Sequence, residues 1–166
     1  MPATRTRTTT ATVAAPFDTV NLARWLRGLT SDEYRSFTPS GAHESHETVA
    51  HDPHTFESVE TIGGTSMRHR YVAEVLEAHR IRCVSADTRG TSMGRFPVRF
   101  RTTWELSALP EGPNTGLTGR IEVEFPSRLW LYLSALSGAP IWLGRHNREE
   151  TPRMAASIAA DAHRHT

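Results

Sequence analysis

Two nearby side chains on one face of a predicted strand have the chemistry of an acid–base pair. In the segment 67–76, His69 and Tyr71 fall on the side that also carries alanine and valine, while arginines occupy the other side. A half-buried histidine can exchange protons near neutral pH, and a tyrosine hydroxyl can polarise a carbonyl group. We predict His69 and Tyr71 as catalytic residues, with His46 as a further candidate. The alternative is that these side chains only pack in the wall of a cavity.

The nine histidines also raise the question of a metal site. His43 and His46 are three residues apart, so on a regular strand they would point to opposite faces and could not bind one ion together. His146 can share a helix face with a glutamate three or four residues later. A zinc site of His46, His69 and His146 with a glutamate is therefore an alternative, although no compact signature such as His-Glu-x-x-His occurs. We predict no metal and no other cofactor.

The composition excludes several classes of function. The net charge is +1 with histidine neutral, so no strong positive field marks a nucleic-acid-binding protein. All 19 basic residues are arginine, and the absence of lysine excludes a Schiff-base lysine and a P-loop lysine. The single cysteine, Cys83, cannot form an intrachain disulfide, and its strand-like surroundings predict a buried thiol.

No segment has the length and hydropathy of a membrane span. The threonine-rich residues 1–10 lack the apolar run of a secretory signal, so we expect a cytoplasmic protein. The most apolar segment, 129–143, is too short to cross a bilayer and is interrupted by Gly138 and Pro140. We expect no stable insertion into a membrane.

The alternation of apolar and polar residues predicts the sheet that positions the candidate side chains. Two long segments, 96–106 and 117–125, alternate on either side of a turn at 110–113. Short connections favour antiparallel pairing of such strands. The same reasoning predicts shorter strands at 8–13, 56–62, 67–76 and 80–87.

Helical segments precede and follow these strands. Asp18 is expected to cap a first short helix, and Ser31 begins a second one. Near the end of the chain, Met154 and Ile158 fall on one face of a helix. Pro152 either opens a new helix or lies inside one longer helix.

The order of these elements predicts an α+β fold. A strongly curved antiparallel sheet of six or seven strands is expected to wrap around a long C-terminal helix, with two short helices after the first strand. This arrangement shelters the apolar stripe of the helix. We expect one domain over residues 1–166, with residues 1–7 flexible.

Three segments resemble the helix-grip superfamily, also called START-like, SRPBCC or Bet v 1-like. They are a strand followed by Ala-Pro and a helix at 12–20, and the two strand segments 101–106 and 116–123. The resemblance covers nearly the whole chain by order of elements. Members of the superfamily include polyketide cyclases and aromatases, lipid and hormone binders, and a few metal-dependent hydrolases, and the chain is interpreted as similar to a polyketide cyclase or dehydratase. The resemblance implies an apolar cavity between the sheet and the C-terminal helix.

The segment 127–144 is longer than the resemblance requires. We expect it to lie near one end of the cavity as a lid or portal, while a homodimer interface or additional core is the alternative. Together with the inward rows of the strands and the C-terminal helix, it supplies the predicted ligand-binding residues, which are Phe100, Trp104, Ile121, Val123, Trp130, Trp142, Met154 and Ile158.

The resemblance implies that the protein binds a small hydrophobic molecule similar to a polyketide. Acid–base cyclisation or dehydration in the apolar cavity, without a cofactor, is the leading prediction. A non-catalytic protein that binds or transfers a lipid is the first alternative. A metal-dependent hydrolase of the same superfamily is the second.

Overall fold

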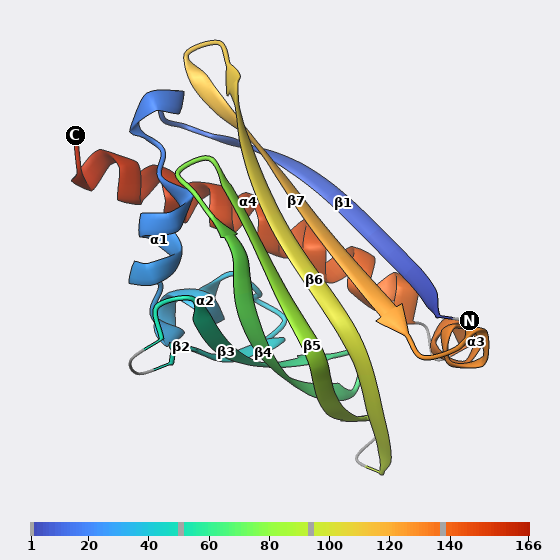
Figure 1. The fold of residues 1–166 in the computed structure, drawn as a ribbon. Helices are drawn as coiled ribbons and strands as arrows, with labels where there is room; N and C mark the ends of the chain where they lie inside the picture. The colour runs from blue at the N-terminus through green and yellow to red at the C-terminus, as the bar shows by residue number, and fades with distance from the viewer. Residues whose placement is uncertain (1, 50–51, 93–94, 137–138) are drawn as a thin grey trace.

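A curved sheet wraps around one long helix in the computed structural model, which describes residues 2–49, 52–92, 95–136 and 139–166 (Figure 1). The strands are β1 (Ala3–Val13), β2 (His43–Thr48), β3 (Thr55–Ile62), β4 (Thr65–Leu76), β5 (Arg80–Ser92), β6 (Phe96–Glu111) and β7 (Asn114–Phe125). The helices are the 3-10 turn η1 (Phe17–Thr19), α1 (Leu22–Gly28), α2 (Ser31–Ser36), α3 (Arg128–Leu136) and α4 (Ala139–Arg164).

The seven strands form a single antiparallel sheet in the order β1-β7-β6-β5-β4-β3-β2. The first strand therefore pairs with the last one, and Ala3 lies opposite Phe125. The predicted α+β architecture is confirmed, including the curved antiparallel sheet and the short helices after the first strand. Strand β1 begins at Ala3, so most of the segment 1–7 that was expected to be flexible is paired with β7.

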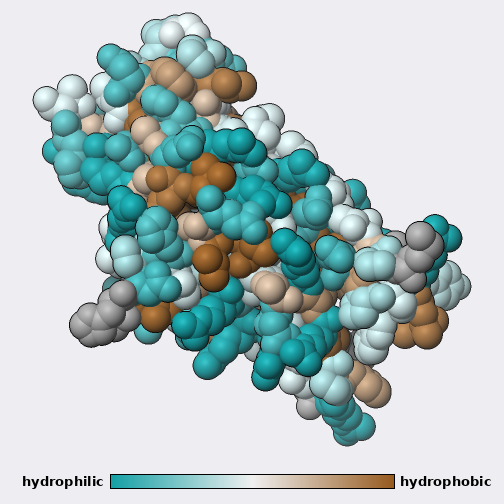
Figure 2. All heavy atoms as spheres, viewed as in Figure 1, coloured by the Kyte–Doolittle hydropathy of each residue, from teal (hydrophilic) through white to brown (hydrophobic). Residues whose placement is uncertain are grey.

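The two faces of the sheet differ in polarity, as the alternation predicts. The face turned away from α4 carries charged side chains such as Arg82, Glu105 and Arg120, and it is largely hydrophilic in the view of Figure 2. The other face carries Leu106 and Leu117, which are fully buried beneath α4. Burial of this apolar row is the main force that holds the sheet against the helix.

The second short helix begins at Ser31 as predicted, whereas the cap of the first lies three residues after the predicted Asp18. Asp18 lies in the 3-10 turn, and the side chain of Asn21 caps α1 by accepting a hydrogen bond from the backbone N–H of Arg24. Thr30 caps α2 in the same way through the N–H of Glu33. Because the 3-10 turn η1 contains Asp18 and precedes α1, it is Asn21 that lies directly before the first turn of α1, where the free backbone N–H groups need an acceptor.

The long helix α4 settles the alternatives left open for Pro152. It runs without interruption from Ala139 to Arg164 and contains Pro152. Its stripe of Met154, Ile158 and Ala162 is buried. In Figure 1, α1 and α2 lie towards the C-terminal end of α4, while α3 lies beside its N-terminal end. None of the described helices is long and apolar enough to cross a membrane.

Candidate functional site

A cavity of about 610 Å³ lies between the inner face of the sheet and α4. Its volume falls within the range of about 300–1,000 Å³ that is common for small-molecule sites. Apolar side chains from α1, β5, β6, β7, α3 and α4 form most of its wall. Of the predicted ligand-binding residues, those on the wall are Phe100, Trp104, Ile121, Val123, Trp130, Trp142 and Met154.

Ile158 is the exception among these residues. It is fully buried but is not part of the cavity wall, so the structure places it in the core that supports the cavity. One turn of helix separates Ile158 from Met154, which does line the cavity. The periodicity of the helix identified the correct face but not the point along it where the cavity ends.

Polar side chains occupy one side of the cavity, where β2, β3, β4, α2 and α4 meet. Tyr34, His46, Glu60, His69 and Glu150 all belong to this part of the wall. Each side chain comes from a different element. Tyr34, His46, His69 and Glu150 are at most 7% exposed, and the side chain of Glu60 is 12% exposed. We refer to these five residues, together with His43 and His146, as the polar cluster.

His69 lies on β4 and is buried, with 3% of its surface exposed. Its Nδ1 lies 3.2 Å from Oγ1 of Thr88, and its Nε2 lies 3.7 Å from a carboxylate oxygen of Glu60. Burial lowers the pKa of His69, and the nearby Glu60 charge opposes this effect. The ring of Tyr71 stacks on His69 with centroids 5.1 Å apart. The structure thus brings the two predicted catalytic residues together on the cavity wall.

Glu60 is a member of the cluster that the sequence reasoning missed. Burial acts to raise its pKa, but the attraction of His69, His43 and His146 and a hydrogen bond from the Tyr34 hydroxyl lower the pKa to about 2. A signal for Glu60 was available in the sequence. It lies four residues after the buried Phe56 on the same strand, and alternation places both side chains on one face.

A β-bulge explains why His43 and His46 both point inwards. His46 lies opposite Ser58 and His43 opposite Glu60, with a shift of register between His43 and Ser45. The extra residue turns His43 to the face of His46, and the two are 2% and 7% exposed. The expectation that they point to opposite faces is wrong, because it assumed a regular strand. Burial lowers the pKa of His46 to about 4.

Helix α4 completes the cluster with two residues one turn apart. Nε2 of His146 lies 3.4 Å from a carboxylate oxygen of Glu150, as the spacing of four residues permits. Burial lowers the pKa of His146 to about 4. Burial raises the pKa of Glu150 well above its ordinary value, and the charge of Glu60 adds to this effect. Both residues continue the stripe of Met154 and Ile158 towards the start of the helix.

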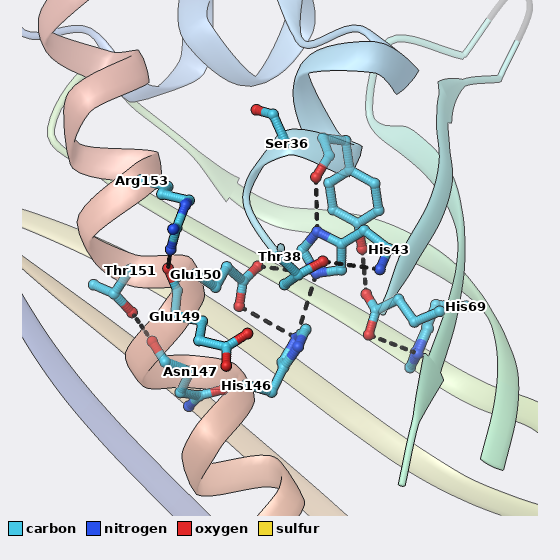
Figure 3. A network of polar contacts seen from close by, with 12 residues as sticks. Ser36, Thr38, His43, His69, His146, Asn147, Glu149, Glu150, Thr151 and Arg153 are labelled. Carbon is cyan, nitrogen blue, oxygen red and sulfur yellow. Dashed lines mark hydrogen bonds and ion pairs between the residues drawn. The ribbon is translucent and has the colours of Figure 1, made fainter. Parts of the chain in front are cut away.

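Figure 3 shows how the cluster joins distant parts of the chain. His146 and Glu150 project from α4 towards His43, while His69 lies on the far side of His43. Nε2 of His43 is 3.3 Å from Nε2 of His146 and 3.6 Å from Glu150. The arrangement offers an ionisable carboxylate, neutral imidazoles and a tyrosine hydroxyl next to an apolar cavity, which suits proton transfer.

The architecture is shared with several solved structures. A START superfamily protein from Mycobacterium smegmatis has a TM-score of 0.53 at 16% identity, with 97% of this chain and 99% of that chain covered. The aromatase/cyclase Zhui from Streptomyces sp. R1128 has a TM-score of 0.57 at 15% identity, covering 98% and 95%. This protein has the START-like (SRPBCC) helix-grip fold.

The START-like fold also occurs in a longer protein, the di-domain ARO/CYC StfQ from the steffimycin biosynthetic pathway. The TM-score is 0.61 at 16% identity, and 95% of this chain aligns with 52% of that one. No protein-family model and no curated protein sequence matches the chain. At such low identities the START-like likeness establishes the fold, and the function must be argued from the site itself.

Proposed function

We propose that the START-like cavity binds a small, mainly apolar and oxygenated molecule, similar to a polyketide, and catalyses its cyclisation or dehydration. The observation that carries this proposal is the contrast between the two sides of one cavity. The wall from β5 to β7 is mainly apolar, with Ser92, Arg99 and Thr102 as its polar residues, while buried histidine, glutamate and tyrosine side chains are gathered on the opposite side. A carbonyl-rich ligand would have its oxygen atoms oriented by this contrast.

The contacts of His69 support its role as the group that moves protons. It faces the cavity and lies beside Glu60, which can hold the imidazolium that forms when His69 accepts a proton. Tyr71 is stacked on His69 and also faces the cavity, so its hydroxyl can polarise a carbonyl group of the same ligand. His46 lies on the same wall, and its Nε2 has no hydrogen-bond partner among the described residues.

Ligand binding and turnover can be measured separately. Binding of an aromatic polyketide is followed through quenching of Trp104 and Trp130, which line the cavity, and turnover is followed with a poly-β-ketone thioester mimic. In His69→Asn and Tyr71→Phe, binding should change by less than about 3-fold while turnover falls by about 100-fold or more. Failure of the wild-type protein to bind any aromatic or aliphatic probe would overturn the proposal.

A second function, binding and transfer of a lipid without catalysis, is favoured by the apolar residues around α3. Leu129, Tyr132 and Ile141 are more than half exposed, and each is next in sequence to a residue that lines the cavity, namely Trp130, Leu133 and Trp142. Apolar side chains are visible at this end of the molecule in Figure 2. Transfer of a fluorescent fatty acid between vesicles, with no product formed from any polyketide mimic, would favour this function over the first.

A further inference from the structure

Three side chains of the polar cluster have the spacing of ligands around one metal ion. The edges of the triangle are 3.3 Å between the Nε2 atoms of His43 and His146, 3.6 Å from His43 to Oε1 of Glu150, and 3.4 Å from His146 to Oε2 of Glu150. Ligand atoms around a tetrahedral zinc ion with bonds of about 2.0–2.1 Å are about 3.3–3.4 Å apart. The two contacts of Glu150 use its two different carboxylate oxygens, and one ligand atom from each of the three groups lies within 4.8 Å of the other two. Small side-chain adjustments would bring the three atoms to the distances that coordination requires.

The ring of His43 is oriented as metal-binding histidines are. Its Nδ1 lies 2.8 Å from the backbone carbonyl oxygen of Tyr34, which can only accept a hydrogen bond. Nδ1 must therefore carry the proton, and the lone pair of Nε2 points towards His146 and Glu150. A backbone carbonyl that fixes the other ring nitrogen in this way is the usual support of a metal-binding imidazole.

The surroundings hold this geometry firmly. The ring of Tyr34 stacks on His43 with centroids 3.8 Å apart and an interplanar angle of 3°. The three side chains of the triangle are at most 7% exposed. Nδ1 of the buried His146 has no hydrogen-bond partner among the described residues, so its Nε2 makes the only polar contacts found for this ring. Nε2 of His146 is thus the ring nitrogen directed at His43 and Glu150.

We propose that His43, His146 and Glu150 bind one divalent transition-metal ion. Two imidazole nitrogens and one carboxylate suit zinc, iron(II) or cobalt(II) rather than magnesium or calcium, which prefer ligand sets made only of oxygen. The set keeps His146 and a glutamate of the site considered from the sequence, adds His43, and leaves out His46 and His69. The proposal also departs from the expectation that the protein needs no cofactor.

The fourth position of such an ion would face the cavity. His146 and Glu150 belong to the cavity wall, and three protein ligands with one open position are typical of catalytic metal sites. An ion there could polarise a carbonyl oxygen of the ligand or activate a water molecule. The metal proposal goes beyond the acid–base function and does not depend on it, because metal binding can be measured without a substrate.

The test uses full-length protein without a histidine tag, stripped with a chelator and titrated calorimetrically with Zn²⁺. We expect one Zn²⁺ per chain, and binding at least about 100-fold weaker in Glu150→Gln and His146→Asn. Two matched variants should bind as the wild type does. Glu149→Gln changes the neighbouring glutamate, which pairs with Arg145, and His69→Asn changes a cavity histidine outside the triangle.

A second measurement needs no variant and remains informative if the substituted proteins fail to fold. In histidine-selective nitrogen NMR spectra of the wild type, Zn²⁺ should shift the Nε2 signals of two rings, and Co²⁺ should give the visible absorption of a tetrahedral ion. No stoichiometric binding, or equal affinity in wild type, Glu150→Gln and His146→Asn, would overturn the proposal. Either result would leave an internal hydrogen-bond network as the role of the triangle, while ligand binding and turnover would still test the acid–base function separately.

Discussion

Nε2 of His43 and Nε2 of His146 lie 3.3 Å apart, although 103 residues separate the two histidines. One ring comes from the bulge of the edge strand β2 and the other from the first half of α4. Their contact joins β2 to α4 on the polar side of the cavity. A displacement of α4 relative to the sheet would change this distance, so the geometry of the polar cluster depends on how the helix packs.

The first prediction separates the core from the cavity wall. Ile158→Ala should lower the free energy of unfolding by about 2–5 kcal/mol, because Ile158 is fully buried and away from the cavity. Phe100→Ala should lower it less, since the Phe100 ring already borders empty space, and should instead weaken ligand binding. Urea unfolding and ligand titration of both variants check this. Equal losses of stability would contradict the assignment.

The second prediction concerns Gly63, which lies against Trp142 at the cavity wall. Gly63 has φ +57°, and a Cβ atom there would come within 2.7 Å of the Trp142 ring. Gly63→Ala should therefore displace Trp142 and alter ligand binding, in addition to a backbone cost of about 1–2 kcal/mol.

Gly64→Ala is the matched control for this substitution. Gly64 has φ +76° and no atom within 4 Å of the added Cβ, so it bears the backbone cost alone. Fluorine NMR of 5-fluorotryptophan-labelled protein should show a shifted Trp142 signal only in Gly63→Ala. The same shift in both variants would mean that the turn, rather than the contact, controls Trp142.

The third prediction is a loss of stability at acid pH through His46. Burial lowers the pKa of His46 from 6.5 to about 4 in the folded protein. As the pH falls from 6.5 to 4, the unfolded chain binds a proton that the folded protein does not, so the free energy of unfolding decreases. The contribution of His46 reaches about 3 kcal/mol and levels off below pH 4, where both states are protonated.

Urea unfolding between pH 4 and 7.5, with a chelator present, checks the role of His46. His46→Gln cannot take up this proton, so its stability should depend less steeply on pH than that of the wild type. Parallel curves for the two proteins would show that His46 does not titrate differently in the folded and unfolded states.

The fourth prediction tests the coupling between Glu60 and His69. The negative charge of Glu60 opposes the effect of burial on His69, so Glu60→Gln should lower the pKa of His69 further. Glu57→Gln is the control, because Glu57 lies on the same strand and pairs with the exposed Arg70. Histidine NMR titrations with a chelator present measure the pKa. An unchanged pKa in Glu60→Gln, or the same decrease in both variants, would contradict the pairing.

The sequence by itself determined the elements and the faces of most candidate residues. Alternation with a period of two assigns a side chain to one face of a strand, and a spacing of four does so on a helix, because both depend only on local geometry. The inward positions of His69, Tyr71 and Trp104 and the buried face of Met154 and Ile158 follow from this.

Only the tertiary structure decided which of these residues meet. The bulge that turns His43 inwards changes the phase of β2, and no repeat in residues 43–48 signals it. The approach of His43 to Glu150 depends on how α4 crosses the sheet, which is set by the packing of the whole core. Contacts between such distant segments arise from the sum of many apolar contacts, so local patterns cannot specify them.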